Sequence, residues 1–361
     1  MGQVVRDALA IALQVGQPVL LWGNPGEGKS KMIEQVAAQL GRPCEVVVGS
    51  VREASDFAGL PMRVGDSVSF APPRWATRCV EAPTTVVFLD ELTTAPPAVQ
   101  AAMLRVVLEH EVGDLRLAPS VSFVAAANPP EVSAGGDDLA PPLANRFCHL
   151  DWAAETAGWV SGLLHGWVPM PVPEVPSARA AVEARWRAVL AGFISARPSI
   201  LRRLPEDLVA QGRAWPSPRS WDQAHRLAAA ADAAGADKEV RSALVTGLVG
   251  PGAAIEFLRF ADAVDLPDPE QLLADPIALD TSARIDLLLA TLAGVSAAVA
   301  GDCTLERWEA AWAVLAVACD AGRADVAALS AVGLLELRRP EWPAPAAAGA
   351  FAPVLRAAEL V

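Results

Sequence analysis

The chain has 361 residues, of which 53% are hydrophobic and 20% are charged. This composition allows two or three folded domains with a large core, and it excludes a disordered chain. The formal net charge of −13 speaks against constitutive binding to duplex DNA, because neutralising DNA phosphates requires a basic face.

Signatures of membrane insertion, secretion and structural metal binding are also missing from the sequence. The longest apolar run, residues 287–300, is too short to cross a bilayer and is rich in Ala and Gly. Residues 1–13 are predicted to form an amphipathic helix, not a signal peptide. The cysteines form no CxxC pair and the histidines no HExxH motif, so we expect neither a disulfide framework nor a metal cluster. We expect a cytoplasmic protein.

The N-terminal part of the chain alternates short apolar runs with helical patterns. Strands are predicted at residues 18–22, 44–48, 85–89, 121–127 and 147–150, and helices at residues 29–40 and 98–110. Strands that are apolar on both faces and alternate with helices indicate a parallel sheet covered by helices on both sides. We therefore predict an α/β fold for this region.

Strand patterns end after this region. Residues 169–176 contain four prolines, which predicts a stiff connection between domains. Further helices are predicted at residues 177–195, 205–213, 220–234 and 237–248, followed by an Ala-rich helical block. The predicted organisation is an α/β domain at 1–168, the connection at 169–176, a helical lid domain at 177–250 and a helical C-terminal extension at 251–361.

The segment after the first predicted strand fits the pattern GxxxxGK[ST]. Its residues are Gly23, Asn24, Pro25, Gly26, Glu27, Gly28, Lys29 and Ser30. The pattern is informative because it follows a strand and opens a helix, where backbone N–H groups converge on phosphate oxygens. We expect Lys29 to reach the β- and γ-phosphates of ATP and Ser30 to bind Mg²⁺. The alternative is an ordinary glycine-rich turn.

Two carboxylates, Asp90 and Glu91, end the apolar run of the third predicted strand. In a parallel α/β sheet, ligands bind beyond the carboxyl ends of the strands. Asp90 is therefore placed to hold Mg²⁺ through water, and Glu91 to polarise an attacking water as general base. Alone, the pair could be a solvated turn after a core strand. Together with the preceding phosphate loop, it indicates a P-loop nucleotide hydrolase.

Several other stretches narrow this interpretation. They are residues 55–61, 68–75, 100–118, 125–129, 143–147 and 216–220. They resemble the MoxR branch of AAA+ ATPases, close to the dynein-related group of CbbQ- and NorQ-like proteins, and the resemblance covers residues 15–230. It implies an α/β P-loop NTPase domain followed by a helical lid, with ATP and Mg²⁺ as cofactors. Residues 251–361 lie outside it.

The resemblance implies roles for three further polar residues. Asn128 would orient the water or touch the γ-phosphate, and Arg146 would act on the nucleotide of a neighbouring subunit. Arg219 would contact the γ-phosphate from the lid of the same subunit. The alternatives are a turn-starting Asn-Pro pair for Asn128, a surface salt bridge for Arg146 and a helix-start charge for Arg219. Arg74 is a rival for the arginine that acts between subunits.

Residues 62–70 are predicted to form a hairpin with Gly65 and Asp66 at its turn. The resemblance places insertions of this kind near the central opening of a ring, so we hypothesise a surface that engages a client. An ordinary loop is the alternative.

The resemblance implies a chaperone-like ring ATPase, with a hexamer as the expectation. It would remodel, activate or mature a protein partner, together with a protein that carries a von Willebrand A domain. A nucleic-acid motor is one alternative, which the acidic charge disfavours. A nucleotide-dependent switch is another, and the presence of Asp90, Glu91 and Arg146 argues against it. We expect no membrane partner.

Overall fold

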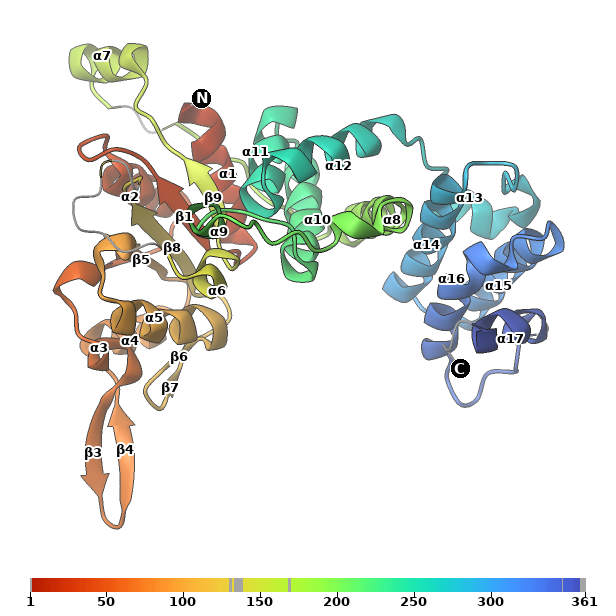
Figure 1. The fold of residues 1–361 in the computed structure, drawn as a ribbon, viewed down its shortest axis with the longest axis horizontal. Helices are drawn as coiled ribbons and strands as arrows, with labels where there is room; N and C mark the ends of the chain where they lie inside the picture. Colours follow the sequence, from red (N-terminus) through yellow and green to blue (C-terminus); the bar gives the residue numbers. More distant parts are fainter. Residues whose placement is uncertain (1, 130–131, 133–138, 168–169, 346, 358–361) are drawn as a thin grey trace. The chain divides into compact units, whose positions relative to one another are not determined.

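A computed structural model describes residues 2–129, 132, 139–167, 170–345 and 347–357 (Figure 1). The chain forms two compact units. The first comprises residues 1–177 and 202–254, and the second residues 178–201 and 255–361.

A five-stranded parallel sheet forms the centre of the first unit. Its strands are β1 (Val19–Trp22), β2 (Cys44–Val48), β5 (Val86–Asp90), β8 (Ser122–Ala127) and β9 (Cys148–Asp151), in the order β2–β5–β8–β1–β9. The register pairs Trp22 with Ala127 and with Asp151, and Val48 with Asp90. The carboxyl ends of the strands therefore share one edge of the sheet. The predicted α/β parallel sheet is confirmed, with strand ends within one residue of those expected.

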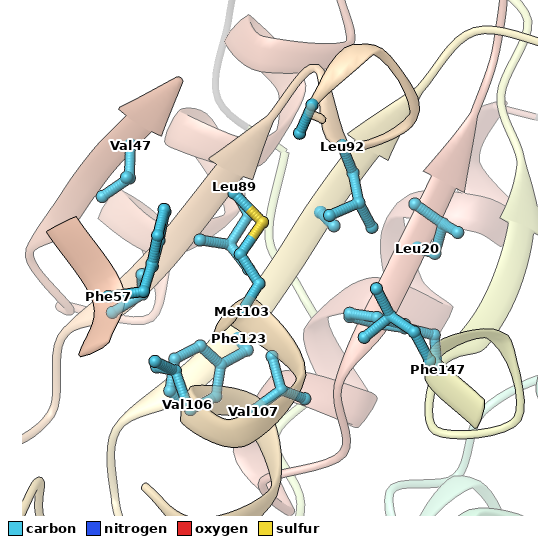
Figure 2. Close-up of a cluster of buried hydrophobic side chains, with 14 of the residues drawn as sticks. Leu20, Val47, Phe57, Leu89, Leu92, Met103, Val106, Val107, Phe123 and Phe147 are labelled. Atoms are coloured by element: carbon cyan, nitrogen blue, oxygen red, sulfur yellow. The ribbon is translucent and has the colours of Figure 1, made fainter. Parts of the chain in front are cut away.

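Helices cover both faces of this sheet. They are α1 (Gly2–Gln14), α2 (Lys29–Gln39), α3 (Ser55–Ala58), α4 (Arg74–Glu81), α5 (Pro97–Glu109), α6 (Pro141–Ala144) and α11 (Lys238–Val249), with the short helices η1 (Gly49–Val51) and η2 (Leu92–Thr94) at strand ends. On one face, Met103 and Val106 of α5 meet Leu89 and Phe123 of the strands, all fully buried or nearly so (Figure 2). On the other face, α1 and α2 contact β8.

Two small hairpins extend the first unit. Strands β3 (Leu60–Val64) and β4 (Ser67–Ala71) form the predicted hairpin, with Gly65 at a φ of 63° in its turn. Strands β6 (Glu111–Val112) and β7 (Leu115–Arg116) form the other. Asp114 joins the two: its carboxylate accepts from the Phe70 N–H at 2.7 Å and its own N–H donates to the Phe70 carbonyl at 3.1 Å. These two bonds hold the base of the β3–β4 hairpin, and its tip projects away from the rest of the first unit (Figure 1).

The remaining helices of the first unit are α7 (Thr156–His165), α9 (Leu208–Gln211) and α10 (Pro218–Ala233). Helix α7 was not expected from the sequence. Its apolar residues Trp159, Leu163 and Leu164 are exposed, so it lacks the buried apolar stripe that marks an amphipathic helix in a sequence.

The second unit is entirely helical in its described part. It contains α8 (Ala180–Ala196), η4 (Pro198–Ile200), most of α12 (Pro251–Ala263), α13 (Pro269–Ala274), η5 (Pro276–Ala278), α14 (Ile285–Gly301), α15 (Leu305–Asp320), α16 (Ala324–Glu336) and α17 (Ala348–Ala357). Trp308 and Trp312 lie in its core, and the Trp308 indole donates to the Leu334 carbonyl at 2.7 Å.

Helix α8 packs against α14, where a Cβ on Gly192 would lie 2.8 Å from that of Ala290. The sequence had grouped α8 with the lid segment 177–250. The domain boundaries expected from the sequence remain a prediction. No helix in the described residues is both long and apolar enough to cross a membrane.

Candidate nucleotide site

The loop between β1 and α2 holds three glycines for two different reasons. Gly26 and Gly28 have φ values of 81° and 80°, and a Cβ on either would meet nothing within 4 Å. Glycine is favoured there by the left-handed backbone, not by crowding. At Gly23 a Cβ would lie 2.6 Å from the Trp152 carbonyl oxygen, so close packing requires the glycine. The loop is shaped as a phosphate-binding loop requires.

Lys29, the first residue of α2, turns its ammonium back over this loop. Its Nζ donates to the carbonyls of Gly23 at 2.5 Å and Asn24 at 3.0 Å, and to Oδ1 of Asn128 at 2.9 Å. Burial lowers the pKa of Lys29, an effect that the nearby carboxylates of Asp90 and Glu27 oppose. The bond to Asn128 joins the start of α2 to the residue that follows β8.

Ser30 and Asp90 offer oxygen atoms that fit a hard divalent cation. The Ser30 hydroxyl donates to Oδ2 of Asp90 at 3.2 Å, which brings the end of β5 against the start of α2. A hydroxyl and a carboxylate are the oxygen ligands that Mg²⁺ accepts, alongside water and substrate phosphates. The residues present thus fit the Mg²⁺ ion that the sequence predicts.

Glu91 adopts a left-handed conformation, with φ 56° and ψ 43°. Such backbone conformations are unfavourable for residues with a Cβ and persist where the surroundings hold them. The exposed Glu91 carboxylate accepts a short hydrogen bond from the Ser50 hydroxyl, which follows β2. Sequence reasoning missed Ser50, because a serine after a strand has no distinguishing pattern.

Comparison with known proteins agrees with this geometry. Residues 18–147 match the AAA domain of the dynein-related subfamily. This segment is an AAA domain. Domains of this family are in general nucleotide-hydrolysing ATPases. No curated protein matches the chain.

Two solved structures share similarity with the chain. A candidate ATPase from Cytophaga hutchinsonii is 16% identical, with a TM-score of 0.44, and the match covers 72% of this chain and 88% of that one. A full-length MCM homologue from Methanopyrus kandleri is 17% identical, with a TM-score of 0.37, covering 72% and 53% of the two chains.

Arg146 and Arg219 both lie in the first unit. Arg146 follows α6 and is half-buried, and its Nη1 donates to the Pro142 carbonyl at 2.7 Å. Arg219 is the exposed second residue of α10. Burial lowers the pKa of Arg146, and the positive charge of Arg219 lowers it further. In the described residues, neither arginine donates to the phosphate loop. Arg74, the rival, is exposed at the start of α4.

Trp22, the last residue of β1, connects the AAA domain's phosphate loop to β9. Its indole N–H donates to Nδ1 of His149 at 2.9 Å, and Nε2 of His149 lies 2.9 Å from the Ala144 carbonyl. A neutral imidazole protonated on Nε2 satisfies both contacts. The Arg213 guanidinium lies 4.0 Å above the Trp22 ring and pairs with Asp151 at 3.0 Å. The sequence pattern gave no indication of this cluster.

Trp152 supports the loop from the other side. Its indole N–H donates to the Glu27 carbonyl at 2.9 Å, and the Asn24 amide donates to Oε1 of Glu27 at 3.0 Å. These bonds fix the outer part of the phosphate loop, which lies between Pro25 and Gly28. Trp152 was also missed, because it lies 125 residues away from Glu27 in sequence.

The buried His149 predicts a pH dependence of folding stability. Burial lowers the pKa of His149 from 6.5 to about 4. The unfolded chain therefore binds the proton more tightly, so this contribution is complete above pH 6.5 and is lost as pH falls from 6.5 towards 4. The full shift corresponds to about 3 kcal/mol. We expect the melting temperature to fall between pH 7 and pH 4.5, and to fall less in His149→Gln.

Calorimetry of the two proteins over this range checks the prediction. His110→Gln is the matched control, because burial also lowers the pKa of His110 and removing it isolates that second contribution. Parallel curves for wild type and His149→Gln would show that His149 is not the group responsible.

Proposed function

We propose that the chain is a ring-forming ATPase that uses ATP and Mg²⁺ to remodel, activate or mature a protein partner. One observation supports the proposed ATP hydrolysis: four polar side chains meet at the carboxyl edge of the sheet. They are Lys29, Asn128, Ser30 and Asp90. Glu91 follows Asp90 directly, with its carboxylate held by Ser50. The test is ATP turnover by the full chain, with Glu91→Gln as the matched inactive variant.

Each residue of this group has a chemical task in the proposal. Lys29 exchanges its contacts with the loop carbonyls for the β- and γ-phosphates, while the loop N–H groups bind the same oxygens. Ser30 and Asp90 hold Mg²⁺, which when bound neutralises charge on the phosphates. Asn128 orients the attacking water, and Glu91 accepts its proton.

The two arginines are the reason for proposing that the protein forms an oligomer. A guanidinium that stabilises the charge on the transferred phosphoryl group must lie close to it, whereas the Arg146 guanidinium donates to the Pro142 carbonyl and makes no hydrogen bond to the phosphate loop of its own chain in the described residues. We propose that Arg146 is supplied to the nucleotide of a neighbouring copy, and that Arg219 contacts a γ-phosphate from α10. Such head-to-tail contacts close into rings, and a hexamer is the expected copy number.

The β3–β4 hairpin is the proposed client contact. Met62, Val64 and Val68 near its tip are 51%, 59% and 62% exposed. Exposed apolar side chains gathered on one projecting element are typical of a protein interaction site. The client would therefore present apolar segments, as an unfolded polypeptide does. A partner with a von Willebrand A domain belongs to the same proposal, on the resemblance alone.

Replacing both Val64 and Val68 with Ser tests the hairpin. We expect reduced, alkylated lactalbumin to stimulate ATP turnover by the wild type and to lose most of this effect on the variant. Basal turnover should stay within about twofold, since surface substitutions of this kind barely change stability. Ile277→Ser is the control, because Ile277 is 83% exposed and lies in the second unit. Equal stimulation of variant and wild type would exclude the hairpin as the contact.

A further inference from the structure

Asn145 joins the element that carries Arg146 to the element that carries Arg219. Its amide N–H donates to the Trp215 carbonyl at 3.2 Å, and its amide oxygen accepts from the Ser217 hydroxyl at 2.7 Å. Asn145 is 7% exposed and Ser217 6%. Both ends of one buried amide are thus bonded to the segment that leads into α10.

The start of α10 is itself fixed by a capping box. The Ser217 hydroxyl accepts from the Ser220 N–H at 3.1 Å, and the Ser220 hydroxyl accepts from the Ser217 N–H at 2.8 Å. Pro218 occupies the first helical position, where its fixed φ favours helix entry. The backbone that carries Arg219 is therefore fixed by the cap, and the Asn145 bond to Ser217 ties it to the residue that follows α6.

The Arg146 side of the link is equally constrained. Its carbonyl accepts from the Gln17 amide at 3.1 Å, and its guanidinium is tied to the Pro142 carbonyl. The Nε of Arg146 is buried and has no hydrogen-bond partner among the described atoms. The positive charge of Arg219 acts on Arg146, which also has an unused buried donor, so an anion beside Arg146 would be stabilised.

We infer that Asn145 is a positioning residue that holds the Arg146 and Arg219 elements as one unit, so that both arginines meet a single phosphoryl group together. This rests on the proposed ATPase function. The resemblance implies that the two arginines act on different nucleotides, whereas the Asn145 link favours one nucleotide for both. Donors that are held in place before the reaction cost no reorganisation in the transition state, which is the advantage such a link provides.

The test compares Asn145→Ala with the wild type as full chains. We expect kcat to fall by about tenfold to a hundredfold. The affinity for ATP should stay within about twofold, because Asn145 does not contact the phosphate loop. Arg219→Ala should cost much less in the Asn145→Ala background than in the wild type, since residues that act as a unit are not additive. Ser217→Thr, which keeps the hydroxyl, should retain most of the turnover.

Three results would overturn the inference. One is a folded Asn145→Ala protein with wild-type kcat. Another is a double variant, Asn145→Ala with Arg219→Ala, whose fold-loss in kcat equals the product of the losses in the two single variants. If Asn145→Ala does not fold, Ser217→Ala removes the bond to Asn145 from the other side. Because this variant also loses the cap of α10, Ser220→Ala, which disrupts the capping box and keeps the Ser217–Asn145 bond, is its control.

The third concerns amide hydrogen exchange, which does not depend on turnover. In Asn145→Ala, residues 143–147 and 213–220 should lose protection together, and a loss confined to 143–147 would contradict the link. A wild type that hydrolyses no ATP would remove the proposed function and the positioning role with it, while the exchange result would still report whether the link exists.

Discussion

Replacing Glu91 with Gln is expected to abolish ATP turnover while ATP binding persists. Gln has nearly the same size as Glu but cannot accept the proton of the attacking water, and loss of a general base costs about 10²–10⁴ in rate. Lys29 keeps its bonds to Gly23 and Asn128 in this variant, and Ser30 keeps its bond to Asp90, since none of these bonds involves the Glu91 side chain. Steady-state phosphate release and equilibrium titration with a fluorescent ATP analogue measure the two properties separately.

Two further variants show whether this effect is specific. Lys29→Ala should lose nucleotide binding as well as turnover, because its ammonium is the cation of the phosphate loop. Ser50→Ala should keep Glu91 as the base and remove only the hydrogen bond that orients its carboxylate. We therefore expect ATP turnover to fall by about tenfold or less. If Glu91→Gln turns over ATP at the wild-type rate, Glu91 is not the base and the hydrolytic proposal must rely on another residue.

The strands of the AAA domain could be predicted because their sequence signals are local. Each of the five is a short apolar run, and these runs alternate along the sequence with segments of helical periodicity. The apolar residues of the runs are largely buried in the fold, as their pattern predicts. Helix α7 lacked such a signal, since its apolar residues Trp159 and Leu163 are exposed and do not form a buried stripe. The packing of α8 on α14 depends on the fit of Gly192 to Ala290, a pairing 98 residues apart that no local pattern encodes.

The site divides in the same way. The phosphate loop and the acidic pair are contiguous motifs, and their residue types alone predict phosphate and metal chemistry. The residues that orient them act across long separations: Ser50 is 41 residues from Glu91, and Asn145 is 72 residues from Ser217. Ser and Asn are common in turns and caps, so only their positions in the folded chain distinguish these two.

Mixing two inactive variants is expected to restore activity if Arg146 acts between subunits. In an equimolar mixture of Glu91→Gln and Arg146→Ala, an interface is complete when the first variant donates Arg146 and the second holds Glu91. Random assembly of a head-to-tail ring makes about one quarter of the interfaces complete. We therefore expect each variant alone to be inactive and the mixture to recover up to about a quarter of wild-type turnover at high protein concentration.

The matched control is an equimolar mixture of wild type with the double variant Glu91→Gln, Arg146→Ala. It also contains about one quarter complete interfaces if Arg146 acts between subunits, and about one half if Arg146 serves its own chain. It therefore shows whether inactive subunits poison a ring. Recovery in the control but not in the test mixture means that Arg146 and Glu91 work within one chain. Full activity of Arg146→Ala alone would remove Arg146 from the reaction, and Arg74, exposed at the start of α4, would become the arginine to test.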